Sequence, residues 1–259
     1  MALAIRVSTE MAENQATETE LPRDGAVMPW MEHLRELRKR IIIVAAVFLV
    51  FAVVCFVVYP QILDFLKAPY CRASPKNCQL YIRGPLEGLS LRVQIAAYGS
   101  LFCTLPVLLF EAWQFVVPGL KSKERKYALP FVLASTTLFL GGMVLAYFTF
   151  EHALQFLITI GGKGVDPLFD PTSYLKLIVT MMLAFGVTFE FPVILVALEL
   201  AGVVTPKQLL AYWRAAIIAV VTLAAVFTPS GDPFSMLVLA CPLIGFYFIA
   251  IGIGKLLKK

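Results

Sequence analysis

Six apolar stretches fill the chain between residues 41 and 254, and each is long enough to cross or nearly cross a lipid bilayer. A hydrocarbon core is about 30 Å thick and a helix rises about 1.5 Å per residue, so about 20 apolar residues span it. Without neighbouring strands, such segments satisfy their backbone groups only as helices. The pattern therefore predicts an all-α, polytopic membrane protein with six transmembrane helices, at Ile41–Tyr59, Val93–Val117, Leu129–Phe150, Tyr174–Leu200, Ala215–Phe227 and Phe234–Gly254.

Composition agrees with this class, since 59% of the residues are hydrophobic, 15% are charged and the mean hydropathy is +0.82. The last two stretches are short. Only 14 residues lie between Arg214 and Pro229, which is about 21 Å of helix. We expect the bilayer to thin around this segment.

Lysine and arginine residues gather in alternate gaps between the apolar stretches. After residue 28, thirteen lie on the side of the N-terminus and seven on the other. Because all the loops are short, the positive-inside rule predicts that both termini are cytoplasmic. The net charge of +5 is then explained by the membrane topology. Nucleic-acid binding would need a basic face on a soluble domain, and the sequence pattern shows none.

Residues 1–28 form a polar tail without an apolar period, so we expect a disordered cytoplasmic segment before a membrane domain at 29–259. No apolar core follows a basic start within this tail, which argues against a signal peptide. The first stretch, entered through Arg38–Arg40, is then a retained anchor. Met1 and Met11 both remain possible starts.

Two of the five cysteines are candidates for a disulfide bond. Cys55, Cys103 and Cys241 lie inside apolar stretches, where a thiol acts as a small hydrophobe. Cys71 and Cys78 lie in the first external loop. If that side is an oxidising periplasm, a disulfide is expected, and the alternative is two free thiols.

The sequence predicts neither an enzyme nor a metal or cofactor site. Its two histidines, His33 and His152, fall on opposite predicted sides of the membrane. A G-x-S-x-G nucleophile elbow is absent. The run Gly161–Gly164 lacks the spacing of a phosphate-binding loop.

Two of the acids inside the apolar stretches are candidates for a role. Glu190 is close to the middle of the fourth, where an ionisable group costs about 2.5–3.5 kcal/mol and usually has a role. The alternative is a glutamate that only hydrogen-bonds a neighbouring helix. Pro192, two residues later, frees a backbone carbonyl group and should bend the helix. Glu111 lies nearer the cytoplasmic boundary and could simply reach the lipid headgroups.

Two further acids lie among basic residues on the predicted cytoplasmic side. In WMEHLRELRKRI, at 30–41, apolar residues recur every three or four positions, which predicts an amphipathic helix in the membrane interface. Glu36 lies on its polar face, where it could bind a ligand or merely pair with Arg40. Glu124 stands among four cations in the second basic loop and could merely offset their repulsion.

Four segments together resemble the TatC family, the signal-peptide receptors of the bacterial twin-arginine protein translocase. They are HLRELRKR at 33–40, LPVLLFEAWQFVVPGLKSKERK at 105–126, FGVTFEFPV at 185–193 and TPSGDPFSMLVLACPL at 228–243. The resemblance covers residues 29 to 257 in order. It implies a cupped bundle of six helices in the bacterial inner membrane. It also implies assembly with the single-span proteins TatA and TatB in an oligomeric TatB–TatC complex, and export of folded proteins driven by the proton-motive force.

The resemblance also assigns roles to individual positions. Glu36 and Glu124 match the acids that receive the paired arginines of the signal peptide, and Glu190 and Asp232 match positions associated with TatA or TatB contact. Where many relatives have a glutamate in the sixth span, this chain has Phe248. The remaining signal-peptide positions are His33, Leu34, Leu37, Arg38, Phe115, Pro118, Leu120 and Arg125.

Two other functions fit part of the pattern. A small proton-coupled transporter would use Glu190 as its carrier, but it should also have a polar lining along several helices, and the other stretches contain few polar residues. An assembly factor without a client would leave the acids at Glu36 and Glu124 unexplained.

Overall fold

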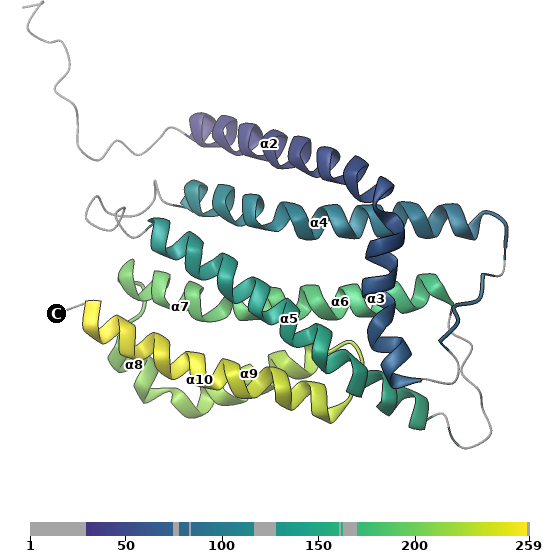
Figure 1. Ribbon diagram of the computed structural model, residues 1–259. Coiled ribbons are helices and arrows are strands. Elements are labelled where there is room, and N and C mark those ends of the chain that lie inside the picture. Colours follow the sequence, from purple (N-terminus) through teal and green to yellow (C-terminus); the bar gives the residue numbers. More distant parts are fainter. Residues whose placement is uncertain are drawn as a thin grey trace, which may run out of the picture. The chain divides into compact units, whose positions relative to one another are not determined.

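The computed structural model describes residues 30–74, 78–82, 84–116, 128–160, 162 and 170–257. Within these ranges the regular structure is entirely helical, without a strand (Figure 1). The fold is therefore all-α, as predicted. The helices are α2 (Trp30–Val57), α3 (Tyr59–Ala73), α4 (Glu87–Val116), α5 (Ala128–Ile160), α6 (Pro171–Phe189), α7 (Phe191–Leu200), α8 (Pro206–Ala211), α9 (Trp213–Phe227) and α10 (Pro233–Leu257).

Five helical segments in the described ranges are long and apolar enough to cross a membrane. They correspond to five of the six predicted spans, which confirms a multi-pass membrane protein. The predicted span Ala215–Phe227 corresponds to α9, whose 15 residues give about 22 Å of helix. The sixth crossing therefore stays a prediction. The five segments are Leu34–Val57, Glu87–Phe115, Leu129–Ile160, Pro171–Leu200 and Pro233–Leu256.

The chain divides into two units, Met1–Lys39 and Arg40–Lys259, and the division falls inside α2. The described part of the first unit is the beginning of α2. The second unit contains the rest of α2 and all the other described helices. The boundary that we predicted at residue 28 lies outside the described residues.

The third predicted span ended too early. The sequence predicts a span that ends at Phe150, directly before the polar residues Glu151 and His152, yet α5 continues to Ile160. Both polar side chains have partners on other helices. Arg72 Nε donates to Glu151 Oε2 at 2.9 Å, and the His152 ring stacks on Phe234 with centroids 4.9 Å apart. These contacts allow the helix to carry polar residues without ending.

The core of the second unit is centred on α5 and α6, which pack side by side. Two glycines allow the close approach. A Cβ atom on Gly142 would lie 2.7 Å from the backbone oxygen of Phe185, and one on Gly186 would lie 2.7 Å from the ring of Phe139. Each helix thus offers a glycine to a phenylalanine of the other, the small-residue packing that brings membrane helices together.

Prolines interrupt the helices, and side chains from other helices bind the carbonyl groups that the prolines leave free. Pro60 has no N–H to donate to the Phe56 oxygen, which accepts instead from Arg92 Nε at 3.3 Å. The guanidinium group of Arg92 also lies over the Phe56 ring, 4.6 Å from its centroid. Arg92 therefore ties α4 to the end of α2.

A second proline, Pro69, lies inside α3. It cannot donate to the Phe65 oxygen, and the Tyr147 hydroxyl group of α5 donates there at 2.8 Å. The Tyr174 hydroxyl group of α6 donates to the Leu66 oxygen at 2.6 Å. Two tyrosines thus bind the backbone of α3 around its proline.

The close approach at Gly142 makes a testable prediction. Gly142→Ala should lower the apparent Tm of the purified protein in detergent by several degrees, because the new methyl group meets a backbone atom that cannot rotate away. Overpacking of this kind costs about 1–3 kcal/mol. Gly141→Ala is the matched control, since nothing lies within 4 Å of a Cβ atom there and alanine favours a helix. Equal Tm values for the two variants would contradict the packing argument.

Candidate functional site

The residues expected to bind a signal peptide are only partly described. In the first unit, α2 carries Leu34 and Arg38 as exposed residues and Glu36 and Leu37 as partly buried ones. His33 also belongs to α2. The segment is helical, as predicted, and is continuous with the first span as the beginning of α2. Pro118, Leu120, Glu124 and Arg125 lie outside the described residues.

In the second unit, the end of α4 is bound to α2 through an arginine. Arg40 Nη1 donates to Glu111 Oε2 at 2.8 Å and to Gln114 Oε1 at 2.9 Å. The pair is mostly buried, since the Arg40 and Glu111 side chains are 15% and 14% exposed. Glu111 is therefore an ion-pair partner within the protein, which corrects the expectation that it could simply reach the headgroups. Phe115 follows in the last turn of α4 and is partly buried.

Glu190 lies where the fourth span is interrupted. It ends α6 and precedes α7, and its N–H donates to the Val187 oxygen at 3.1 Å. Pro192 follows as the second residue of α7, so the predicted interruption at this proline is confirmed. The break places a partly buried carboxyl group within an otherwise apolar span.

The Glu190 side chain lies close to Ser135 of α5. Ser135 is fully buried and accepts a hydrogen bond from Trp113 Nε1 of α4 at 2.7 Å. The Oε1 oxygen of Glu190 is buried and has no hydrogen-bond partner among the described residues. Sequence reasoning missed the Ser135 contact, because a serine in an apolar run carries no signal of a partner on another helix.

Asp232, expected to contact TatA or TatB, is 1% exposed and caps α10. One carboxyl oxygen accepts from the Ser235 N–H at 2.7 Å, and the other accepts from the Ser230 hydroxyl group. Gly231, in between, has a φ of +63°, which only glycine adopts without strain. Asp232 thus stabilises its own turn, as an N-cap aspartate does.

A second intramembrane acid, Glu199, was overlooked although it stands nine residues after Glu190 in the same apolar run. It is fully buried on α7. Its carboxyl group occupies the space that a side chain at Gly254 of α10 would need. Beside it, the Tyr247 hydroxyl group donates to the Leu209 oxygen at 2.7 Å. Glu199 therefore belongs to the packing of α7 against α10.

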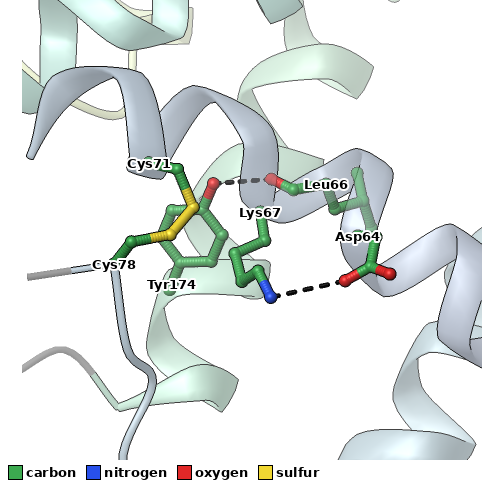
Figure 2. The surroundings of a disulfide bond; sticks show 6 residues. All are labelled: Asp64, Leu66, Lys67, Cys71, Cys78 and Tyr174. Atoms are coloured by element: carbon green, nitrogen blue, oxygen red, sulfur yellow. Dashed lines mark hydrogen bonds and ion pairs between the residues drawn. A yellow bond between two sulfur atoms is a disulfide. The ribbon is translucent and has the colours of Figure 1, made fainter. Parts of the chain in front are cut away.

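A disulfide joins Cys71, in the last turn of α3, to Cys78 (Figure 2). Their Cα atoms are 4.8 Å apart, within the usual range for a disulfide. Figure 2 shows the bridge beside Tyr174, whose hydroxyl group donates to Leu66. The bridge therefore closes the loop next to the part of α3 that the tyrosines hold. Cys55, Cys103 and Cys241 are free thiols.

Comparison with known proteins identifies the relatives of this chain. A family model described as "Sec-independent protein translocase protein (TatC)" matches residues 32–242. A TatC protein of Frankia casuarinae is 41% identical over 240 residues, covering 88% of this chain and 66% of its own length, so the chain spans just under two thirds of that relative. A TatC protein of Synechocystis is 34% identical over 260 residues, covering 98% of this chain and 100% of the relative.

A solved structure is also similar. It is described as the crystal structure of the twin-arginine translocase receptor TatC in the detergent DDM. It superposes with a TM-score of 0.70 at 31% sequence identity and covers 86% of this chain and 99% of that chain.

The bridged loop makes a prediction about redox state and sidedness. In a variant with Cys103 and Cys241 replaced by alanine, a membrane-impermeant maleimide added from the external side should label the protein only after reduction, because Cys55 is buried. The bridge should contribute about 2–3 kcal/mol of stability in the chain-entropy description.

The control is a further Cys71→Ser change, which leaves Cys78 without its partner and should allow labelling without reductant. Labelling of the parent variant before reduction would refute the disulfide. If no label reaches the loop after reduction, the loop is not external.

Proposed function

The chain belongs to the TatC family of Sec-independent protein translocase proteins, and we propose that it is the receptor that binds twin-arginine signal peptides. The observation that carries the proposal is the family match over residues 32–242. Both acidic positions expected to receive the arginines, Glu36 and Glu124, lie inside it. The chain is thus a multi-pass membrane component of a protein translocase, and its client is a folded precursor with such a peptide.

The chemistry of arginine supports an acidic receptor site. A guanidinium group is a planar fork that binds a carboxylate through two hydrogen bonds, whereas a lysine ammonium group is a point charge. Exposed ion pairs contribute only about 0–1 kcal/mol. Glu36 is partly buried, and a hydrogen bond to a charged group contributes about 1.5–3 kcal/mol. Leu34 and Leu37 on the same helix offer apolar contact for the rest of the peptide.

We place the protein in the bacterial inner membrane with both termini in the cytoplasm. After residue 28, lysine and arginine are in excess on the N-terminal side, thirteen against seven, which supports this orientation. It requires α9 to complete a sixth crossing despite its length of 15 residues. The start of α2 and the loop after α4 would then share the cytoplasmic side, so one peptide could contact both acids.

TatA and TatB are the proposed partners, and Glu190 is the proposed contact. In hydrocarbon, water does not compete, so a polar residue on a partner helix can hydrogen-bond the carboxyl group. Asp232 would contribute through the turn that it caps, since both its oxygens already accept hydrogen bonds there. Assembly with these partners would allow the translocase to export folded proteins with the proton-motive force.

A proton-coupled transporter is the weaker candidate. In a transporter, buried hydroxyl groups should line a polar path across the membrane. Three buried hydroxyl groups of the described residues instead donate hydrogen bonds to the backbone of their own helix. Ser100 donates to the Ala97 oxygen, Thr149 to the Leu145 oxygen and Thr188 to the Ala184 oxygen. Such groups are satisfied locally and leave little for a transported ion.

The receptor assignment predicts how charge changes affect peptide binding. Glu36→Lys should abolish photocrosslinking to a twin-arginine peptide, because repulsion replaces a hydrogen bond. Glu124→Ala should weaken binding by about 10- to 100-fold, the factor for one charge-assisted contact. A twin-lysine peptide should lose most of its affinity, because the net charge stays while the forked hydrogen bonds vanish.

Asp64→Lys is the matched control, since this exposed acid of α3 contacts Lys67 of its own helix and lies on the opposite predicted side. It should leave crosslinking unchanged. If Glu36→Gln lowers stability slightly and leaves peptide crosslinking intact, Glu36 serves only to pair with a neighbouring cation, and its receptor role is wrong.

A separate prediction concerns partner recruitment. Glu190→Ala should abolish crosslinking of TatA to the fourth span, because the hydrogen-bonding group is removed, and should leave signal-peptide binding intact. Glu190→Gln should keep part of the contact, since its amide still accepts and donates. If Glu190→Ala blocked peptide binding as strongly as TatA crosslinking, the residue would belong to recognition.

A further inference from the structure

The end of α4 is held by a cation from another helix. Arg40 of α2, in the same unit as α4, donates from Nη1 to Glu111 Oε2 at 2.8 Å and to Gln114 Oε1 at 2.9 Å. Its Nη2 makes a longer contact of 3.4 Å with the Gln114 backbone oxygen. Because α4 ends at Val116, this oxygen is one of the last four, which lack a partner within the helix. Arg40 therefore caps the C-terminus of α4, the end that favours a positive charge.

The side chains that bind Arg40 lie on the same face of α4 as Phe115. Glu111 and Gln114 are three residues apart, and Phe115 follows Glu111 by four. Residues at these spacings are neighbours on the surface of a helix. The proposed peptide contact at Phe115 therefore lies one turn beyond the ion pair, at the end of the helix that Arg40 caps.

A second contact holds α4 from a different face. Trp113 Nε1 donates to Ser135 Oγ of α5 at 2.7 Å, and the Trp113 ring packs on Phe131 with centroids 4.9 Å apart. The end of α4 is thus attached to α5 through Trp113 and to α2 through Arg40. Without the Arg40 contact, α4 would remain attached to α5, but the face that carries Phe115 would lose its support.

The ion pair offers direction more than stability. The Arg40 and Glu111 side chains are 15% and 14% exposed, so both charges lose most of their hydration. Replacing a buried ion pair by apolar residues of similar volume is often neutral or stabilising, whereas removing one partner is strongly destabilising. An apolar pair could therefore hold the two helices together. Apolar contact has no direction, and it would leave the Gln114 oxygen uncapped.

We propose that Arg40 and Glu111 are positioning residues of the signal-peptide site, whose ion pair holds the last turn of α4 so that Phe115 meets the peptide. Arg40 acts through α4 and does not contact the peptide, since its guanidinium group binds acceptors of its own chain and would repel the arginines of the peptide. The inference rests on the proposed receptor function and on Phe115 as a peptide contact.

The test compares peptide affinity with stability in the purified full-length protein in detergent. A fluorescent twin-arginine signal peptide reports the Kd, and thermal unfolding reports the Tm. Arg40→Met combined with Glu111→Leu should keep the Tm close to that of the unchanged protein. It should weaken peptide binding by about 5- to 30-fold, the factor for one lost aromatic contact in an interface.

Phe115→Ala shows whether the ion pair acts through this ring. Alone it should weaken peptide binding by a similar factor. Added to Arg40→Met and Glu111→Leu it should cost little more, because effects that pass through one group are not additive. Full additivity would mean that the ion pair acts elsewhere, and the positioning role would be wrong.

The matched control is the other ion pair between a described arginine and glutamate of different helices. Arg72 Nε of α3 donates to Glu151 Oε2 of α5 at 2.9 Å, on the opposite predicted side of the membrane. Arg72→Met combined with Glu151→Leu should leave peptide affinity unchanged. A loss of affinity as large as that of the Arg40 and Glu111 variant would show a general effect of removing an ion pair and would contradict the inference.

Wild-type affinity in the Arg40→Met and Glu111→Leu variant overturns the inference, because the ion pair would then only stabilise the fold. If this variant fails to accumulate, Glu111→Asp decides. It keeps the charge but withdraws the carboxylate by one methylene group from Arg40, so it should weaken peptide binding, and unchanged affinity refutes the positioning role. If the unchanged protein does not bind the peptide, the receptor function is wrong and the positioning role falls with it.

Discussion

Backbone carbonyl groups that have lost their helical partner are the constraint on which the arrangement of helices depends. Where packing keeps water away from these groups, the protein must supply their hydrogen-bond donors. The Phe56 oxygen accepts from Arg92, and the Phe65 oxygen accepts from Tyr147. The Leu209 oxygen, at the break between α8 and α9, accepts from Tyr247. Each donor comes from another helix, so each interruption becomes a contact between helices.

Hydropathy alone predicted the helical class and located five spans, because apolar length is a local property of the sequence. Because hydropathy reads only this local property, it predicted the end of α5 ten residues too early. Glu151 and His152 interrupt the apolar run, but their partners, Arg72 and Phe234, come from distant parts of the chain. The crossing of α5 and α6 was equally hidden, since Gly142 matters only through the Phe185 backbone that it meets.

The residues of the candidate site also differ in whether the local sequence reveals them. Glu190 could be found from the sequence, because an acid in an apolar run is conspicuous, and Pro192 marked the break. Ser135 could not, because nothing in the sequence around it indicates the hydrogen bond that its hydroxyl group accepts from Trp113. Asp232 carried a local signal that was not used: an aspartate directly before Pro233 is typical of a helix N-terminus, and the resemblance directed attention to a partner instead.

The two acids Asp232 and Glu190 show how a structural carboxylate differs from one available for contact. Asp232 has both oxygens bonded within its turn, so the fold uses its full capacity. At the break before α7 the backbone is satisfied differently, since the Glu190 N–H donates to the Val187 oxygen. The Glu190 side chain makes no capping hydrogen bond at the break, and its buried Oε1 has no hydrogen-bond partner among the described residues. A partly buried acid that the fold neither needs nor fully satisfies carries a cost in hydrocarbon, and binding of a partner's donor is what would offset that cost.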